Sequence, residues 1–297
     1  MKEKITKTNI YKILTVALAV VLVIALILII KNRVVEKNAQ KQYERLASQV
    51  NDLQDQMNDN RITVPSDDTA DGTEAVPDSG ETTQESTASE EDTELEQKGI
   101  DIPQKNLNWQ KLKSVNADIY AWLTIPGTDI DYPVLQHPTD DSYYLNYNMN
   151  GTRGYPGCIY TELANSKDFT DFDTVIYGHN MKNDMMFGEL HNYGDQTFFD
   201  QNPYIYVYTG DKVLVYEIFA AYQTDDTHIL GGNDFSTDEG RVSYLETIVK
   251  HTQGSPKVRE MVQLSVDSHL LTLSTCVNEE SDERFLVQAI LLNEDQL

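Results

Sequence analysis

One uninterrupted apolar run near the N-terminus limits most strongly what this chain can fold into. Residues 13–30 are apolar apart from Thr15, and a helix of that length just spans the hydrocarbon core of a bilayer. Residues 1–12 are polar and basic, and no small-residue cleavage site directly follows the run. The pattern therefore predicts an uncleaved, single-pass transmembrane signal-anchor. Lys and Arg flank both ends, so their distribution does not choose the orientation.

The segment that follows, residues 31–58, has a heptad-like spacing of apolar residues. These positions, four and three residues apart, are Ala39, Tyr43, Leu46, Val50, Leu53 and Met57. About three repeats is the minimum for a coiled coil. The spacing predicts a helical stalk, and two forms stay open. One is a coiled coil that makes a homodimer, and the other is a single solvated helix that continues the membrane span.

Composition changes sharply over residues 59–100, which are rich in Asp, Glu, Ser, Thr and Gly and nearly free of apolar residues. Such a segment cannot bury enough apolar surface to offset the entropy lost on ordering, so we expect a disordered acidic linker. The whole chain has a formal net charge of −25, much of it outside the globular part. That charge argues against a nucleic-acid partner, because phosphate binding needs clustered Lys and Arg.

Residues 101–297 are long enough for one folded domain, and they alternate strand-like runs with turn residues. The expected strands are 121–125, 132–135, 158–161, 174–177, 204–208, 213–222, 271–276 and 285–292, and the expected helices are 108–116, 185–191 and 238–252. Many short strands at regular intervals predict an all-β barrel or sandwich with helices added at its edge.

The strand predicted at 271–276 ends on a cysteine, Cys276, where an apolar run meets a polar segment. Eight residues later Arg284 begins another apolar run, so the two runs predict a hairpin with Cys276 and Arg284 at the same end. Far upstream, the strand predicted at 174–177 is followed by a glycine and His179. A thiol, an imidazole and a guanidinium at strand ends are the components of a cysteine acyl-transfer site.

Each of these residues also has a simpler interpretation. A free cysteine is most often a small buried apolar residue, which is how we interpret Cys158, and a Cys158–Cys276 disulfide would abolish the activity. Arg284 also fits a charge on the rim of a barrel, paired with a nearby carboxylate. The chain has six histidines, but only His179 directly follows an apolar strand and a glycine. Paired His or Cys spacing is absent from the sequence, so we expect no metal and no cofactor.

Several motifs together resemble the sortases, the membrane-anchored cysteine transpeptidases of Gram-positive surfaces. The resemblance rests on residues 272–276 (Thr-Leu-Ser-Thr-Cys), Arg284, and residues 177–181 (Tyr-Gly-His-Asn-Met). The resemblance is to class B in particular over three further stretches, residues 122–128, 131–136 and 187–190. The helical segment before the cysteine strand also resembles class B. The resemblance covers about two thirds of the chain, from about Trp109 to the C-terminus.

The resemblance selects a closed, eight-stranded β-barrel, with an N-terminal helix and a long helix before the cysteine strand. It places domain 101–297 outside the cell and residues 1–12 in the cytoplasm. It implies that Cys276 is the nucleophile, that His179 is the general acid and base, and that Arg284 stabilises the oxyanion and the substrate. A guanidinium suits the last role because it keeps its protons near neutral pH. We also predict that neighbouring residues bind substrate, namely Ser274, Thr275 and Asn180.

The implied reaction joins two partners. Cys276 attacks the carbonyl of a threonine in the sorting-signal peptide of a secreted surface protein, and an amine of a peptidoglycan precursor or a pilin then takes the acyl group from the thioester. The loops at 227–235 and 278–283 do not specify the peptide motif. Two other functions stay open: hydrolysis by a cysteine protease that uses the same three residues, and a non-catalytic peptide-binding scaffold at the cell surface.

Overall fold

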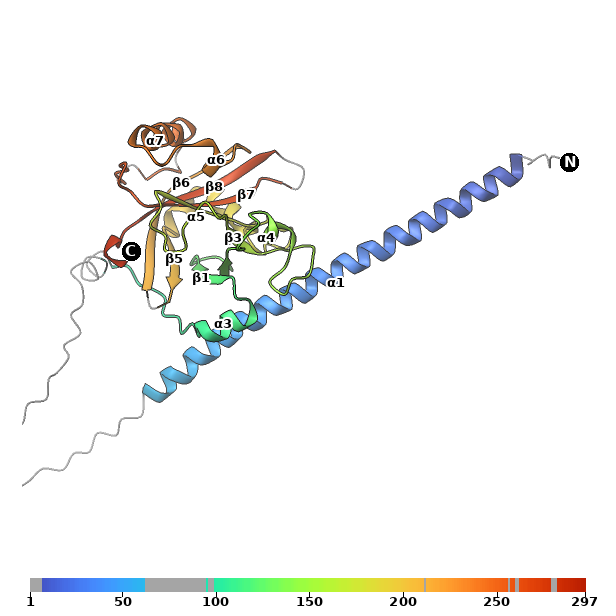
Figure 1. Ribbon diagram of the computed structural model, residues 1–297, viewed down its shortest axis with the longest axis horizontal. Coiled ribbons are helices and arrows are strands. Elements are labelled where there is room, and N and C mark those ends of the chain that lie inside the picture. The colour runs from blue at the N-terminus through green and yellow to red at the C-terminus, as the bar shows by residue number, and fades with distance from the viewer. Residues whose placement is uncertain are drawn as a thin grey trace, which may run out of the picture.

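The computed structural model describes residues 7–61, 95, 99–210, 212–255, 257–259, 262–278 and 282–297 of this protein. Figure 1 shows a barrel of strands with short helices around it and one long helix, α1, that passes along one side. The acidic linker predicted at 59–100 lies almost entirely outside the described residues. At its end, Leu95 and Ile100 are buried against the core of the barrel.

Eight strands close into a barrel in the order β1-β2-β3-β4-β7-β8-β6-β5. They are β1 (Ile119–Thr124), β2 (Asp131–Leu135), β3 (Ile159–Thr161), β4 (Asp173–Tyr177), β5 (Tyr204–Thr209), β6 (Lys212–Asp225), β7 (Leu270–Cys276) and β8 (Glu283–Leu291). Each lies where the sequence predicts a strand. The predicted barrel is therefore confirmed, and the sandwich is excluded.

The apolar side chains of the strands pack into two different clusters. The main cluster takes residues from all eight strands. The second includes residues of helix α7 (Asp238–Thr252), and both Tyr244 of the helix and Val175 of β4 belong to it. The next residue of β4, Ile176, belongs to the main cluster instead. This division follows from the period of two along a strand, which sends successive side chains to opposite faces of the sheet.

Two of the three predicted helices begin at capping residues. The side chain of Asn108 accepts a hydrogen bond from the backbone of Lys111 at the start of α3 (Trp109–Val115), and Thr237 caps α7 in the same way. The helical segment predicted at 185–191 is a 3-10 helix, η1 (Gly188–Gly194). In the described parts of the barrel domain, four helices too short to show a helical period were not predicted: α4 (Tyr143–Asn146), α5 (Gln196–Gln201), α6 (Ile229–Gly232) and η2 (Glu294–Gln296).

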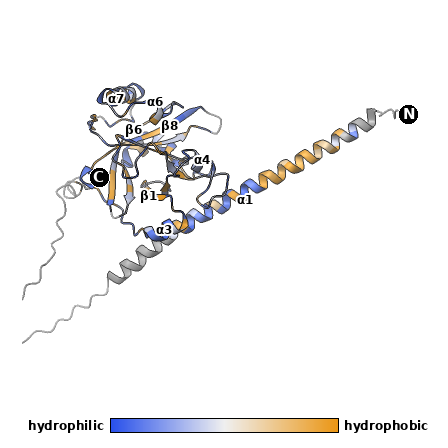
Figure 2. Cartoon of the chain, in the orientation of Figure 1, coloured by the Kyte–Doolittle hydropathy of each residue, from blue (hydrophilic) through white to orange (hydrophobic). Residues whose placement is uncertain are grey.

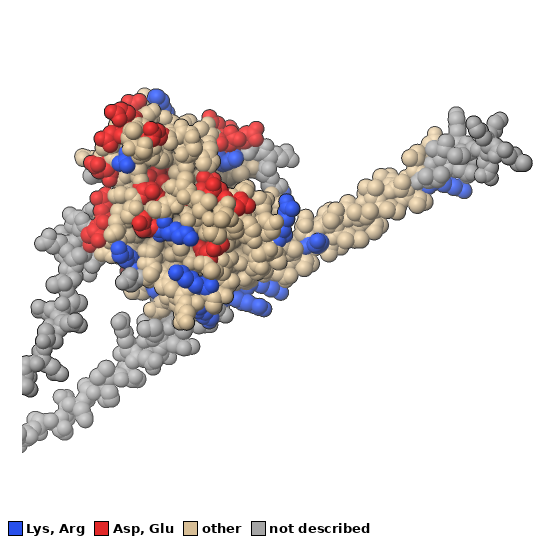
Figure 3. Space-filling model, in the orientation of Figure 1, with Lys and Arg blue, Asp and Glu red and all other residues tan. Residues whose placement is uncertain are grey.

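Helix α1 (Lys7–Arg61) is continuous through the predicted membrane span and the predicted stalk. Figure 2 shows that its apolar stretch extends away from the barrel. Among the described residues this is the one helix long and apolar enough to cross a membrane, and the apolar stretch is not buried. Figure 3 shows acidic side chains gathered over the barrel and α7, whereas basic side chains follow α1 beyond the apolar stretch.

Beyond the apolar stretch, one face of α1 packs against the barrel. Ala39, Tyr43 and Leu46, the first three residues of the predicted heptad seam, are only 3–5% exposed. Their spacing places them on one face of the helix, but the surface that they meet is the barrel of the same chain. The side chains of the other three seam residues lie outside the described part, so the coiled-coil homodimer stays a prediction.

A buried polar network connects α7 to the strands. Asp173, at the start of β4, is 1% exposed and accepts hydrogen bonds from the hydroxyls of Tyr244 (2.8 Å) and Thr272 (2.9 Å). The amide of Gln288 donates to both of these hydroxyls. Burial raises the pKa of Asp173 to about 7, although the two donated hydrogen bonds oppose the shift. The network therefore joins β4, β7 and β8 to the helix on their outer face.

Candidate active site

The parallel pairing of β4 and β7 brings His179 to the same mouth of the barrel as Cys276. In the register of the two strands Tyr177 lies opposite Ser274, and the backbone N–H of the next residue, Gly178, donates to the Ser274 carbonyl at 3.2 Å. His179 and Cys276 each lie two residues beyond this pair. On the other side of β7, Cys276 and Arg284 are direct partners in the antiparallel pairing with β8.

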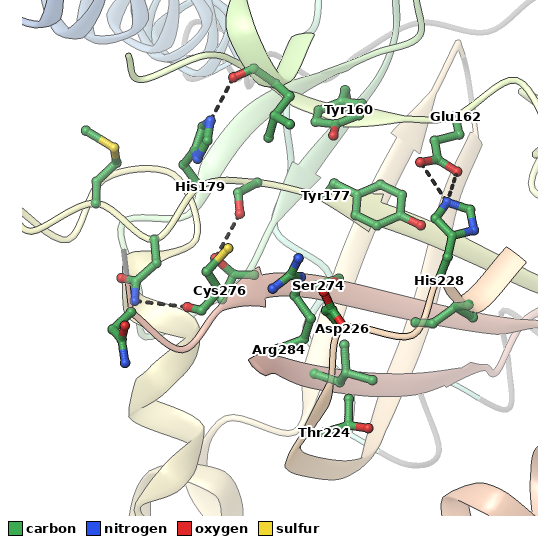
Figure 4. A pocket seen from close by; sticks show the side chains of 18 of the residues that line it. Tyr160, Glu162, Tyr177, His179, Thr224, Asp226, His228, Ser274, Cys276 and Arg284 are labelled. Carbon is green, nitrogen blue, oxygen red and sulfur yellow. Dashed lines mark hydrogen bonds and ion pairs between the residues drawn. The ribbon is translucent and has the colours of Figure 1, made fainter. Parts of the chain in front are cut away.

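These residues surround a cavity of about 570 Å³. All six predicted site residues line it: Cys276, His179, Arg284, Ser274, Thr275 and Asn180. In Figure 4 the sulfur of Cys276 lies between the imidazole of His179 and the guanidinium of Arg284. The structure therefore brings together a thiol, an imidazole and a guanidinium, three groups that acyl transfer by a cysteine can use.

The two cysteines have different environments. Cys276 is partly exposed at the end of β7, and Cys158 is completely buried. Burial raises the pKa of the Cys158 thiol to about 12, so this thiol stays protonated and unreactive at neutral pH. Both thiols are free, which excludes the Cys158–Cys276 disulfide in this structure.

The imidazole of His179 is held by a backbone carbonyl. Its Nε2 atom lies 2.7 Å from the carbonyl oxygen of Leu145. Because a carbonyl oxygen can only accept, Nε2 carries a proton, and the neutral ring keeps Nδ1 as its acceptor. Burial lowers the pKa of His179, and the hydrogen bond to Leu145 acts in the opposite direction. The ring is thus held in one tautomer, with one nitrogen left for proton transfer.

Arg284 is fixed by the sheet on both sides. It lies in β8 opposite Cys276 of β7 and opposite Thr224 of β6. Its Nη1 also donates to the carbonyl of Glu283 at 3.3 Å. A residue in the middle of three paired strands has little freedom in its backbone, so the guanidinium is presented to the cavity from a rigid base.

The backbone just after the sulfur is held by two side chains, of which sequence analysis predicted only one as part of the site. The amide of Asn180 donates to the carbonyls of Cys276 and Val277, both at 3.1 Å. His191 Nε2 lies 3.2 Å from the Cys276 carbonyl, and its ring packs on Phe285. The same His191 nitrogen lies 3.0 Å from Nδ2 of Asn180, so the tautomer of His191 decides whether it donates to the carbonyl or accepts from the amide. No signal in the sequence distinguished His191, because its role depends on a contact 85 residues away.

The two other predicted substrate-binding residues lie on β7. The hydroxyl of Thr275 donates to the carbonyl of Gly178 at 2.8 Å, and Ser274 is 5% exposed. Gly178 itself has no room for a side chain, because a Cβ there would lie 2.8 Å from the ring of Phe187. The glycine before His179 is therefore required by close packing, and Thr275 ties it to the cysteine strand. Substrate binding by Ser274, Thr275 and Asn180 stays a prediction.

The opposite end of the cavity holds a contact between a histidine and a carboxylate that the sequence did not indicate. His228 Nε2 lies 2.8 Å from the carboxylate of Glu162, and the His228 ring stacks on Tyr177 with 6.5 Å between ring centres. The pair joins the end of β3 to the start of α6 (Figure 4). Among the described residues, no group of three or more His, Cys, Asp or Glu side chains is arranged to hold a metal ion.

The barrel, the thiol at its mouth and the family comparison together define the class of this protein. A family model for the sortase domain matches residues 123–292, more than half of the chain. The chain therefore belongs to the sortase family, whose members are cysteine transpeptidases.

Within the family, the relatives are of class B. Sortase B of Listeria monocytogenes is 33% identical over 183 residues, which cover 61% of this chain and 72% of the relative. The crystal structure of Clostridium perfringens sortase B has a TM-score of 0.54 and 30% identity, covering 61% of this chain and 98% of that one. A class B sortase of Streptococcus pyogenes involved in pilus biogenesis also has a TM-score of 0.54 and 30% identity, covering 62% and 98%.

Proposed function

We propose that this protein cleaves a sorting motif of secreted proteins after a threonine, through a thioester on Cys276, and transfers the acyl group to an amine of the cell wall or of a pilin. The observation that carries the proposal is the presence of Cys276, His179 and Arg284 in one cavity at the mouth of the barrel. Family membership supports acyl transfer as the reaction type.

In the first half-reaction, the thiolate of Cys276 adds to the threonine carbonyl carbon and forms a C–S bond. The guanidinium of Arg284 stabilises the negative charge on the carbonyl oxygen. Collapse of this intermediate breaks the C–N bond, and the leaving amine takes a proton from the imidazolium of His179 through Nδ1. The products are a thioester on Cys276 and a free C-terminal peptide.

In the second half-reaction, the acceptor amine gives a proton to the neutral His179 and attacks the thioester carbonyl. A C–N bond forms, the C–S bond breaks, and the Cys276 thiolate is restored. Without an acceptor, water takes the same place and the outcome is hydrolysis. The balance between transfer and hydrolysis therefore depends on which nucleophile enters the cavity.

The position of the cavity suits substrates that are attached to the membrane. The apolar part of α1 anchors the protein as a single pass, and the barrel lies outside the cell. Glu36 of α1 lines the cavity and lies six residues beyond the apolar run, which corresponds to about 9 Å along a helix. Exposed basic residues of this segment, such as Lys31 and Arg33, lie where they can meet anionic headgroups.

The test is a mass-spectrometric assay of the full chain in detergent micelles. Peptides of the Leu-Pro-x-Thr-Gly type, varied at the first and third positions, are incubated with and without triglycine as acceptor. We expect an acyl-enzyme adduct and a triglycine-linked product with the unmodified protein and with Cys158→Ala, the matched control. Cys276→Ala should give neither. Cleavage by Cys276→Ala, or hydrolysis alone in the presence of acceptor, would show that the proposed function is wrong.

A further inference from the structure

The ring of His179 is enclosed by residues 145–157, which we call the histidine loop. Besides the Leu145 carbonyl on Nε2, the ring of Tyr155 meets the imidazole edge-on, with 4.8 Å between ring centres. A Cβ on Gly157 would lie 3.3 Å from Cδ2 of His179 and 2.7 Å from the Tyr144 carbonyl. The loop is therefore packed directly against the imidazole, and a small shift of Gly157 changes the space that the ring occupies.

The histidine loop is closed on itself by a buried side chain. Asn148 is 1% exposed, donates to the carbonyl of Thr152 at 3.1 Å, and accepts from the backbone N–H of Gly157 at 3.1 Å. These bonds connect the two halves of the loop, so it moves as a unit. A contact that fixes Gly157 therefore also fixes the rest of the histidine loop.

The remaining contact on Gly157 comes from α1. The hydroxyl of Tyr43 donates to the Gly157 carbonyl at 2.9 Å in a buried hydrogen bond, and the Tyr43 ring meets Tyr132 of β2 edge-on at 5.5 Å. Earlier in α1, Cγ1 of Val35 lies 3.6 Å from the position of a Cβ on Gly154. Figure 1 shows α1 passing the barrel beside the loop that follows α4, in agreement with these two contacts. The membrane-bound helix thus contacts the loop at both Gly154 and Gly157.

We propose that Tyr43 of α1 is a positioning residue of the active site, which holds the histidine loop in place and thereby fixes the imidazole of His179. The inference rests on the proposed function, since it assumes that His179 transfers protons. Its physical basis is that proton transfer depends steeply on geometry, and a displacement of about 1 Å far from the chemistry can lower a rate about 100-fold. The docked part of α1 then has two functions: it carries the membrane anchor, and it completes the support of a catalytic group.

Two variants of Tyr43 in the full chain, purified in detergent micelles, test this proposal. Tyr43→Ala removes the ring and the hydrogen bond, and Tyr43→Phe removes the hydrogen bond alone. Glu44→Ala, an exposed neighbour on the same helix, is the control. The first readouts are the melting temperature and the kcat and KM for the peptide that is cleaved fastest in the assay described above, with triglycine as the acceptor. The third is the NMR signal of His179, labelled with carbon-13 at Cε1 and assigned through His179→Asn.

We expect Tyr43→Ala to lower kcat about 10- to 100-fold with KM within about twofold, and to shift or broaden the His179 signal. Tyr43→Phe should lower kcat about two- to tenfold and move the signal less. Glu44→Ala should resemble the unmodified protein. A role limited to stability would lower the melting temperature but leave kcat of the folded enzyme and the His179 signal unchanged, and that result would overturn the proposal.

If Tyr43→Ala does not fold, Tyr43→Phe decides the question by the same criteria, because it keeps the packing of the ring against Tyr132. If the unmodified protein transfers no peptide, the proposed function has failed, and the His179 signal decides this inference without substrate. A signal that is identical in the unmodified protein and the folded Tyr43 variants then shows that α1 does not position His179.

Discussion

Cys276 and Arg284 lie directly opposite each other in neighbouring strands, with paired Cα atoms in the antiparallel register of β7 and β8. Directly paired residues have Cα atoms about 4.5–5.5 Å apart, and their side chains leave the same face of the sheet. Cys276 and Arg284 are therefore positioned by backbone hydrogen bonds of the barrel. Because this geometry does not depend on a mobile loop, it is available before substrate binds.

Replacing Arg284 tests whether the guanidinium stabilises the oxyanion. We expect Arg284→Ala to lower kcat/KM about 100- to 1000-fold, the usual cost of losing one oxyanion donor, and Arg284→Lys to recover little, since an ammonium lacks the planar fork. Steady-state cleavage of the best library peptide measures this. Arg259→Lys is the control, because Arg259 binds the carbonyl of Ile218 and should affect stability only. A loss below threefold in Arg284→Ala would exclude the role.

Variants of Asn180 test whether its side chain positions Cys276 or binds substrate. Its amide donates to the carbonyls of Cys276 and Val277, so Asn180→Ala should cost about 1–3 kcal/mol of stability and lower kcat more than it raises KM. Asn180→Asp should be worse, because a carboxylate then faces two carbonyl oxygens. Urea unfolding and steady-state kinetics measure both effects. If KM rises while kcat is retained, the sequence-based prediction of substrate binding is correct instead.

The pH dependence of catalysis should reflect the burial of His179. The reactive form keeps one proton on the Cys276–His179 pair, so activity rises as the fully protonated pair loses its first proton. Burial disfavours the charged imidazolium and lowers the pKa of His179, so this acid limb of the kcat/KM profile should lie below pH 6.5, the ordinary value for histidine. Tyr155→Ala exposes the ring to water and should move this limb upward. Glu36, Lys182 and Arg284 line the same cavity and should be kept unchanged in the comparison. An acid limb above 6.5 in the unmodified protein contradicts the prediction.

The pH dependence of the free energy of unfolding should show the titration of Asp173. Its pKa is raised to about 7 in the folded protein, so between about pH 4 and pH 7 the folded state holds a proton that the unfolded state has released. This contribution to the free energy of unfolding therefore decreases as pH rises through that window. Asp173→Asn cannot titrate, and at pH 8 it should be about 1–3 kcal/mol more stable than the unmodified protein. Urea unfolding at pH 5 and pH 8 measures the free energy of unfolding of both proteins. An equal change in this free energy between the two pH values would contradict the prediction.

The length of the acidic linker should not affect turnover. Because Tyr43 and its neighbours on α1 pack on the barrel, this helix sets the distance between the predicted membrane span and the cavity. We expect deletion of residues 70–81 to change kcat and KM less than twofold in vesicles that carry the full chain. A clear dependence of turnover on linker length would show instead that the linker sets this distance.

The amino-acid sequence by itself determined the local structure of this protein. The alternation of apolar residues located the eight strands, and the short polar turn between residues 276 and 284 predicted a hairpin with Cys276 and Arg284 at the same end. The Gly-His pair after an apolar strand singled out His179 among six histidines. These features depend on neighbours in the chain, which is why residue patterns specify them.

The tertiary structure alone decided which distant surfaces meet. A period of two shows that β4 and β7 are strands but does not say that they are parallel neighbours, and it is this pairing that places His179 beside Cys276. The contact of His191 with the cysteine backbone depends on the same assembly. A heptad seam likewise shows that α1 has an apolar face without naming its partner, and Tyr43 finds that partner in the barrel of its own chain. Apolar burial is not directional, so the choice among possible partners is made only when the whole fold packs.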